Sequence, residues 1–170
     1  MPNKQVDTVD AILKQWRQVR PDVDVSPIAV IGHISRLSRL VDRKLNENFA
    51  RFDIEDWGYD MLATLRRHGE PYELSAGELT RQTMVTTGAI TNRIDRLEKR
   101  QLVVRVSSTD RRKVIVRLTP TGLKLVDSIV ASHMETEHAI LAALSTRQQQ
   151  NLANVLRSVL TFLGDLPVGG

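Results

Sequence analysis

The chain contains no cysteine among its 170 residues. This excludes a disulfide framework, a thiolate metal site and a cysteine-based redox sensor. No apolar run approaches the ~20 residues that cross a bilayer, and the first ten residues have no apolar signal segment. We therefore expect a cytoplasmic globular protein without a membrane partner.

The usual features of catalytic and cofactor sites are missing as well. The sequence shows no nucleophile with a base partner, no phosphate-binding glycine loop and no ligand set with metal spacing. His133 and His138 lie near Glu135 and Glu137, but the spacing of the two histidines places them on different faces of a helix. We expect no enzyme, no metal and no cofactor, although an enzyme remains the rival from a different functional class.

Positive charge is modest overall but concentrated in one part of the chain. The formal net charge is +4 and the isoelectric point is about 9.8. One segment holds nine basic residues: Arg93, Arg96, Lys99, Arg100, Arg105, Arg111, Arg112, Lys113 and Arg117. A local cluster of this kind indicates a nucleic-acid partner more strongly than the net charge does.

The spacing of apolar residues predicts helices on both sides of this basic segment. We expect one over residues 7–20, a long one from Pro27 to about Phe52, and a third that Asp53 caps and that ends before Gly69. After the basic segment, Thr119 caps a helix that reaches residue 144. Ser145 and Gln148 match a capping box, which opens a last helix.

The basic segment has the pattern of two short helices followed by a hairpin. Ser75 and Glu78 match a capping box, which opens a short helix with Leu79 directed inward. A second helix follows a turn and runs to about residue 100, with Ile90, Ile94 and Leu97 as its buried ridge. The β-branched runs 102–106 and 114–118 flank a polar loop. This order predicts a helix-turn-helix followed by a β-hairpin wing.

We therefore predict a mainly α fold with a small β wing and three functional parts. Residues 1–52 form N-terminal helices for dimerisation and a pocket wall, residues 53–118 form the winged helix-turn-helix domain, and residues 119–170 form C-terminal dimerisation helices. The apolar stripes of the flanking helices exceed what one small domain needs. A two-fold homodimer would bury them and pair two readers on a palindromic site, while a compact monomer is the alternative.

The second helix of the motif provides candidate DNA contacts. Rotation of roughly 100° per residue places its polar side chains opposite the buried ridge. Threonine hydroxyls can reach phosphates or base edges, asparagine can pair with adenine, and arginine can pair with guanine. An ordinary solvated helix face is the alternative for each residue. With the capping serine, the candidates are Ser75, Thr86, Thr87, Thr91, Asn92 and Arg96.

The loop of the predicted hairpin provides a second set of DNA contacts. Residues 107–113 are too polar to pack into a core, and Arg111 is the expected tip residue. An arginine at that tip suits the negative potential of a narrow minor groove. Asp110 can orient it through a charge-assisted pair, and Arg112 adds positive charge. The alternative is a charged hairpin tip without a DNA role.

Two charged residues occupy unusual positions in their helices. Arg93 falls roughly 70° from the buried ridge, at the rim between the groove-facing surface and the protein body. Asp60 lies within the apolar run 57–65, where an ionised carboxylate needs a partner. From the residues alone, a structural salt bridge between Asp60 and an arginine is the preferred interpretation, and a ligand site is the other.

The segments "TTGAITNRIDRLEKRQLVVR" and "DRRKVIVRLTPTG" closely resemble the MarR family of transcription regulators. The N-terminal segment is similar to that of the urate-responsive and PecS-like branch. This resemblance implies a repressor that an anionic purine or phenolic ligand releases. The branch's ligand residues, one tryptophan, one aspartate and two arginines, correspond here to Trp16, Asp60, Arg93 and Arg105.

In the implied mechanism, Trp16 forms part of the pocket wall and Arg93 pairs with the ligand. Arg105 holds the opposite side of the ligand or Asp60, and repulsion between the ligand and Asp60 shifts the recognition helix. The alternatives are a regulator that responds to another phenolic ligand or to none, and a winged-helix protein that binds other proteins and not DNA. Trp16 could also be a plain interface aromatic.

Overall fold

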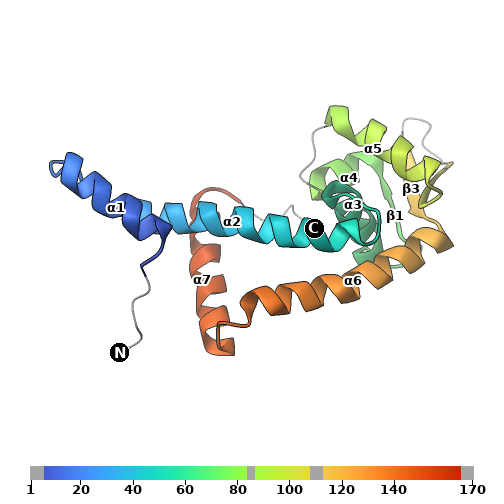
Figure 1. Ribbon diagram of the computed structural model, residues 1–170. Helices are drawn as coiled ribbons and strands as arrows, with labels where there is room; N and C mark the ends of the chain where they lie inside the picture. The colour runs from blue at the N-terminus through green and yellow to red at the C-terminus, as the bar shows by residue number, and fades with distance from the viewer. Residues whose placement is uncertain (1–5, 84–86, 108–112, 166–170) are drawn as a thin grey trace. The chain divides into compact units, whose positions relative to one another are not determined.

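The computed structural model describes residues 6–83, 87–107 and 113–165 (Figure 1). These belong to two compact units, residues 1–44 and 45–170, which divide within one long helix, α2 (Pro27–Ala50). The mainly helical fold with a small antiparallel sheet confirms the predicted class. In the described part of the chain, no helix combines the length and the apolar character that crossing a membrane requires.

The first unit contains α1 (Thr8–Val19) and the start of α2. The Asp7 side chain accepts from the amides of Val9 and Asp10 and so caps α1 at its N-terminus. Val9, Leu13 and Val25 are buried together in a small core. The predicted helix over residues 7–20 is confirmed, and Pro27 occupies the first position of α2 as expected.

The second unit begins with α3 (Asp56–Arg67), whose cap differs from the prediction. Glu55, and not Asp53, is the N-cap residue, and its side chain makes no capping hydrogen bond. Asp53 has a φ of 51°, in the left-handed region, and its carboxylate pairs with Arg100. The chain turns sharply between α2 and α3, so Asp53 is used in the turn and not at the helix end.

Four further helices follow: α4 (Ala76–Gln82), α5 (Thr87–Lys99), α6 (Pro120–Leu141) and α7 (Thr146–Phe162). The capping boxes predicted at Ser75 and Ser145 are both present, and the Thr119 hydroxyl accepts from the amide of Gly122 at 3.0 Å. These caps satisfy free amides at the starts of α4, α6 and α7. They confirm where the sequence places the starts of these three helices, while α6 ends at Leu141, three residues before the predicted end.

A three-stranded antiparallel sheet has the order β1-β3-β2. Strands β2 (Val103–Val106) and β3 (Ile115–Leu118) form the predicted hairpin. Strand β1 (Glu73–Ser75) was not predicted, and it pairs Leu74 with Val116 on the other edge of β3. Three residues are too short for an alternating pattern to show in the sequence.

The core of the second unit lies between α3, α4, α5, α6 and the sheet (Figure 1). Its fully buried members are Met61, Leu62, Leu65, Leu79, Ile94, Leu97, Val103, Val116, Val126 and Ile129. The ridge predicted for α5 is confirmed, since Ile90, Ile94 and Leu97 are all buried. This packing fixes which face of α5 points outward. Helix α7 contrasts with it, because α7 has no buried residue.

Candidate nucleic-acid interface

Helices α4 and α5 pack against each other and form the two arms of the predicted helix-turn-helix. The Ser75 hydroxyl accepts from the Glu78 amide at 3.2 Å and donates to the Glu78 carboxylate at 2.5 Å. It is therefore engaged in the cap at the start of α4. Thr87 is the first residue of α5, and Thr86 lies outside the described residues.

The outer face of α5 is polar and accessible. Thr91 and Asn92 are exposed, on the side away from the buried ridge. Within the described residues, neither side chain forms a hydrogen bond. Their donors and acceptors are therefore free to reach base edges and phosphates.

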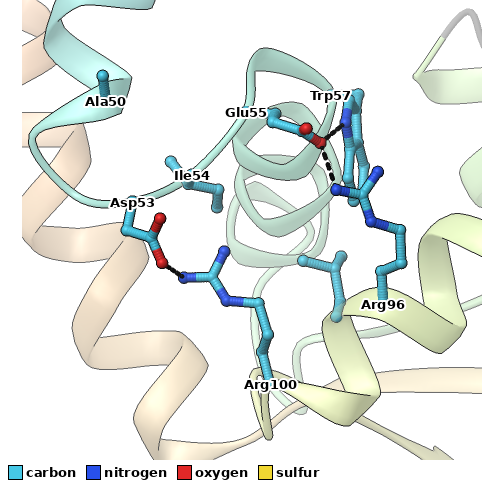
Figure 2. A pocket seen from close by; sticks show the side chains of 8 residues that line it. Ala50, Asp53, Ile54, Glu55, Trp57, Arg96 and Arg100 are labelled. Carbon is cyan, nitrogen blue, oxygen red and sulfur yellow. Dashed lines mark hydrogen bonds and ion pairs between the residues drawn. The ribbon is translucent and has the colours of Figure 1, made fainter.

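Arg96 is exposed as predicted, but its guanidinium already has partners. It lies 4.6 Å from the centre of the Trp57 ring and pairs with Glu55 at 2.9 Å. Figure 2 shows Glu55 accepting from both Arg96 and the indole of Trp57. The hydrogen bond from Arg96 is the main reason that the pKa of Glu55 is lowered. Glu55 thus holds a candidate base-reading arginine against the body of the domain.

These side chains line a cavity of about 260 Å³ between the α2–α3 turn and the second half of α5 (Figure 2). On its other side, Arg100 pairs with Asp53 at 3.3 Å. Its lining also includes the apolar side chains of Ile54 and Leu97. Arg96 and Arg100 are one helical turn apart on α5. Each therefore pairs with a carboxylate from the connection between α2 and α3.

Asp60 and Arg93 lie in one electrostatic neighbourhood. Burial raises the pKa of the half-buried Asp60 carboxyl, and the positive charges of Arg67 and Arg93 partly oppose this rise. Among the described residues, Asp60 forms no salt bridge, so the structural ion pair favoured from the sequence is not made there. Arg93 instead lies 5.4 Å from the centre of the Trp57 ring. Asp60 is thus a partly buried carboxyl without a salt bridge, close to an arginine of α5. A titratable group with a shifted pKa in such a position is a candidate functional residue.

Arg105 has a different environment from the one its predicted ligand role implies. It extends from β2 to α5 and forms salt bridges with Asp95 and Glu98. The Arg105 amide also donates to Glu98 at 3.0 Å. The hydrogen bond to Asp95 is the main cause of the raised pKa of Arg105. Asp60 is not among these partners. The Asp95 side chain is exposed, but it contacts Arg105 of the wing strand β2.

The remaining predicted site residues lie elsewhere. Trp16 belongs to the first unit and is 46% exposed, so its place in a ligand pocket stays a prediction. Asp110, Arg111 and Arg112 at the expected wing tip lie outside the described residues. Lys113, at the near end of β3, is exposed.

Sequence patterns did not reveal a cluster of aromatic rings formed by Phe49, Tyr59 and His133. Tyr59 stacks on Phe49 with ring centres 4.7 Å apart, and His133 lies 4.9 Å from Tyr59. Burial, followed by the charges of Glu137 and Asp60, raises the pKa of the Tyr59 hydroxyl. No cluster suited to a metal ion occurs among the described residues. Aromatic residues at helical spacing are normally interpreted as core residues, so this cluster can be recognised only from the folded structure.

Two packed helices, a hairpin after the second helix and a sheet closed by β1 define a winged helix-turn-helix protein. The family model described as "MarR family" matches residues 52–113. The chain belongs to the MarR family, whose members are transcription regulators and not enzymes.

One relative is the HTH-type transcriptional regulator PecS of Dickeya dadantii (strain 3937). It is 39% identical over 152 residues, which cover 89% of this chain and 92% of PecS. The fold is also similar to that of Sco3205, a MarR family regulator of Streptomyces coelicolor solved in complex with DNA. That similarity has a TM-score of 0.75 at 21% identity and covers 84% of this chain and 90% of Sco3205.

A third similar structure is BpsR of Bordetella bronchiseptica, whose DNA binding is regulated by 6-hydroxynicotinic acid. The TM-score is 0.67 at 23% identity, over 76% of this chain and 91% of BpsR.

Proposed function

We propose that this MarR-family regulator is a repressor that binds a palindromic operator as a homodimer and is released by a small anionic aromatic ligand such as urate. The observation that supports DNA reading best is the outer face of α5. Thr91 and Asn92 are exposed there, directly opposite a ridge that is almost completely buried. A helix held this firmly by one side presents the other side in a fixed orientation to the major groove.

The contacts divide into positioning and reading contacts. Thr86, Thr87 and the start of α5 suit phosphate oxygens, while Asn92 suits adenine. Arg96 can pair with guanine once its guanidinium leaves Glu55. Ser75 stabilises α4, so any contact it makes with a phosphate is additional to its cap. The wing residues Asp110, Arg111 and Arg112 would contact the minor groove or the backbone.

The flanking helices support a dimer. Helix α7 has no buried side chain, although Leu152, Val155, Val159 and Leu160 are between 37% and 62% exposed. In the first unit, Trp16, Val30, Ile31, Leu37 and Leu40 are also exposed by 44% or more. Apolar surface in this amount is usually covered by another chain. A two-fold axis would place two α5 helices about one DNA turn apart.

The ligand site would contain Asp60 and Arg93, with Trp16 as an aromatic wall. An anionic ring would attract the Arg93 guanidinium and repel the ionised Asp60 carboxylate. Because Arg93 belongs to α5, this change in forces acts directly on the recognition helix. A coupling free energy of about 1 to 3 kcal/mol is sufficient for substantial release. BpsR, regulated by a small aromatic acid, supports this class of ligand.

Anisotropy titrations of a DNA fragment carrying the protein's own promoter test the proposal. The protein should bind that fragment in preference to a scrambled one, with salt-dependent affinity. Saturating urate should weaken binding, and Asp60→Ala should bind DNA normally but no longer respond. Unchanged affinity with urate would reject urate and leave another phenolic ligand or none. Absence of any sequence preference would favour a protein-binding role on the same scaffold.

A chromosomal operator also implies where the protein acts. We infer the cytoplasm as its compartment, because the proposed DNA target is located there.

A further inference from the structure

Arg105 connects the wing to the recognition helix. It occupies the third position of β2, opposite Val116 of β3. Its guanidinium crosses to α5, where one terminal nitrogen donates to Asp95 and the other to Glu98. Glu98 accepts in addition from the Arg105 amide at 3.0 Å. One residue of the strand is therefore held through both its side chain and its main chain.

The two carboxylates form a matched site for a guanidinium. Asp95 and Glu98 are three residues apart on α5, so they project from the same face of the helix. An arginine fork binds two acceptors in a fixed plane, whereas an ammonium group acts as a point charge. Arg105 is 32% exposed and Glu98 is 35% exposed, so both are partly shielded from water. The geometry fixes the distance and the rotation of β2 relative to α5.

A second contact attaches β2 to α5 at the start of the hairpin. At the start of the hairpin, the Leu102 amide donates to the Leu97 carbonyl at 3.0 Å. The base of the hairpin is also held by the core, where Val103 and Val116 are buried, and by the pairing of β3 with β1. Arg105 adds a contact between the same strand and α5, three residues beyond Leu102 and closer to the tip. These contacts therefore fix the direction of β2 (Val103–Val106) relative to α5.

The charge balance argues against a direct role for Arg105 toward an anion. Two carboxylates face one guanidinium, so the three side chains together carry a formal charge of −1. An anionic ligand or a phosphate would have to displace a carboxylate to reach it. Arg93 offers a contrast, because among the described residues no carboxylate lies within salt-bridge distance of its guanidinium. Of the two arginines expected to bind ligand, only Arg93 is available.

We propose that Arg105 is a positioning residue that holds the wing at a set distance and angle from the recognition helix, with Asp95 and Glu98 as its partners. This inference rests on the proposed function, since it assumes that α5 and the wing both contact DNA. Helix α5 and the wing of one chain then behave as one rigid unit. A helix in the major groove and a tip in the minor groove require this fixed spacing.

The test compares two conservative substitutions, Arg105→Lys and Arg117→Lys. Arg105→Lys keeps the charge but loses the planar fork. Arg117 pairs with one carboxylate, that of Glu73 at 2.5 Å, and this pair joins β3 to β1. On the promoter fragment, methylation protection of guanines reports α5, and hydroxyl-radical protection of the flanks reports the wing.

We expect Arg105→Lys to lose flank protection, to retain central guanine protection and to lower operator affinity about tenfold. Arg117→Lys should behave as wild type. The double variant Asp95→Asn, Glu98→Gln should lose the same flank protection, although removing negative charge by itself favours DNA binding. Urate affinity, measured by calorimetry, should be unchanged in Arg105→Lys.

Three results would overturn the assignment. The first is a wild-type footprint and affinity for Arg105→Lys. The second is a uniform loss of flank and central protection in a variant with normal thermal unfolding. The third is loss of urate binding with an intact footprint, which would make Arg105 a ligand residue. If the wild-type protein itself gives no footprint, the proposed function fails, and not the positioning role.

Discussion

The imidazole Nε2 of His33 lies 2.7 Å from Oδ2 of Asp7, and this contact joins α2 to the N-cap of α1. The other ring nitrogen contacts the carbonyl of Ala29. When both nitrogens carry hydrogen, the ring donates to two acceptors at once. The hydrogen bond to Ala29, followed by that to Asp7, raises the pKa of His33. The protonated form therefore attaches α1 more strongly than the neutral form does.

We predict that α1 is held most firmly below pH ~6.5, the ordinary histidine pKa. A group with a raised pKa in the folded state contributes its full stabilisation there and loses it as the pH rises through the raised value. Amide exchange in α1 should therefore be slower at pH 6 than at pH 8.5, after correction for intrinsic rates. His33→Gln should remove this difference. Equal pH dependence in both proteins would contradict the role of the contact.

Asp60 gives a second pH-dependent prediction, in which the ionised form of the side chain destabilises the folded state. Because burial raises the pKa of Asp60, the folded state disfavours its charged form. Asp60→Asn should increase the free energy of unfolding at pH 7, by less than about 1 kcal/mol because the site is only half-buried. The gain should shrink as the pH falls toward ~3.9. Urea unfolding of both proteins between pH 5 and 8 measures it, and a destabilised variant at pH 7 would contradict it.

Releasing Arg96 from Glu55 should strengthen DNA binding. In Glu55→Gln, the guanidinium loses its ionic partner and becomes available to the groove. Because this ion pair is exposed and contributes little, operator affinity should increase by no more than about fivefold. Asp127→Asn is the control, because Asp127 pairs with Arg66 at 2.7 Å with similar exposure but away from α5. Equal effects of the two substitutions would indicate net charge alone.

The predicted tip contact is tested by Arg111→Ala. Loss of one phosphate or minor-groove contact should weaken operator binding and reduce the magnitude of the slope of log affinity against log salt by about one. Ligand affinity should stay unchanged, because the tip is not part of the proposed pocket. Anisotropy titrations at several salt concentrations provide the slope. Full retention of affinity and slope would remove Arg111 from the interface.

Gly122 gives a prediction about stability, independent of ligand and DNA. A Cβ at this position would collide with the main-chain carbonyl of Leu102, which also accepts from Thr119. Gly122→Ala should cost several kcal/mol, as overpacking against main chain does. At Gly77 in α4, a Cβ would meet only the end of Arg81 at 3.9 Å. Gly77→Ala should therefore unfold no more easily than wild type in a thermal melt.

The sequence was sufficient to place the helices because their signals are local. Ser75 with Glu78 and Ser145 with Gln148 each lie within four residues, and the ridge of α5 repeats within three turns. Strand β1 depends on pairing with β3, whose residues lie 40 to 44 positions later in the chain, and no local pattern encodes it. Asp53 shows the same limit, because a carboxylate before a helix resembles a cap until the turn is known.

The candidate site was predictable by face but not by partner. Helical spacing placed Arg93 and Arg96 correctly outside the core. It could not show that both guanidinium groups would lie over the ring of Trp57 of α3, since that contact joins two helices. Likewise, the two carboxylates of α5 could not be matched to Arg105 until β2 was positioned beside them.

The position of Trp57 makes it an intrinsic fluorescence probe of the recognition helix. The guanidinium groups of Arg93 and Arg96, both carried by α5, lie 5.4 and 4.6 Å from its ring centre. An excited indole responds to nearby charge, so displacement of the recognition helix should change the emission colour. The chain has two tryptophans, and Trp16→Phe leaves this one as the sole emitter. Stopped-flow mixing with an effector could then time the motion of the DNA reader without an attached dye.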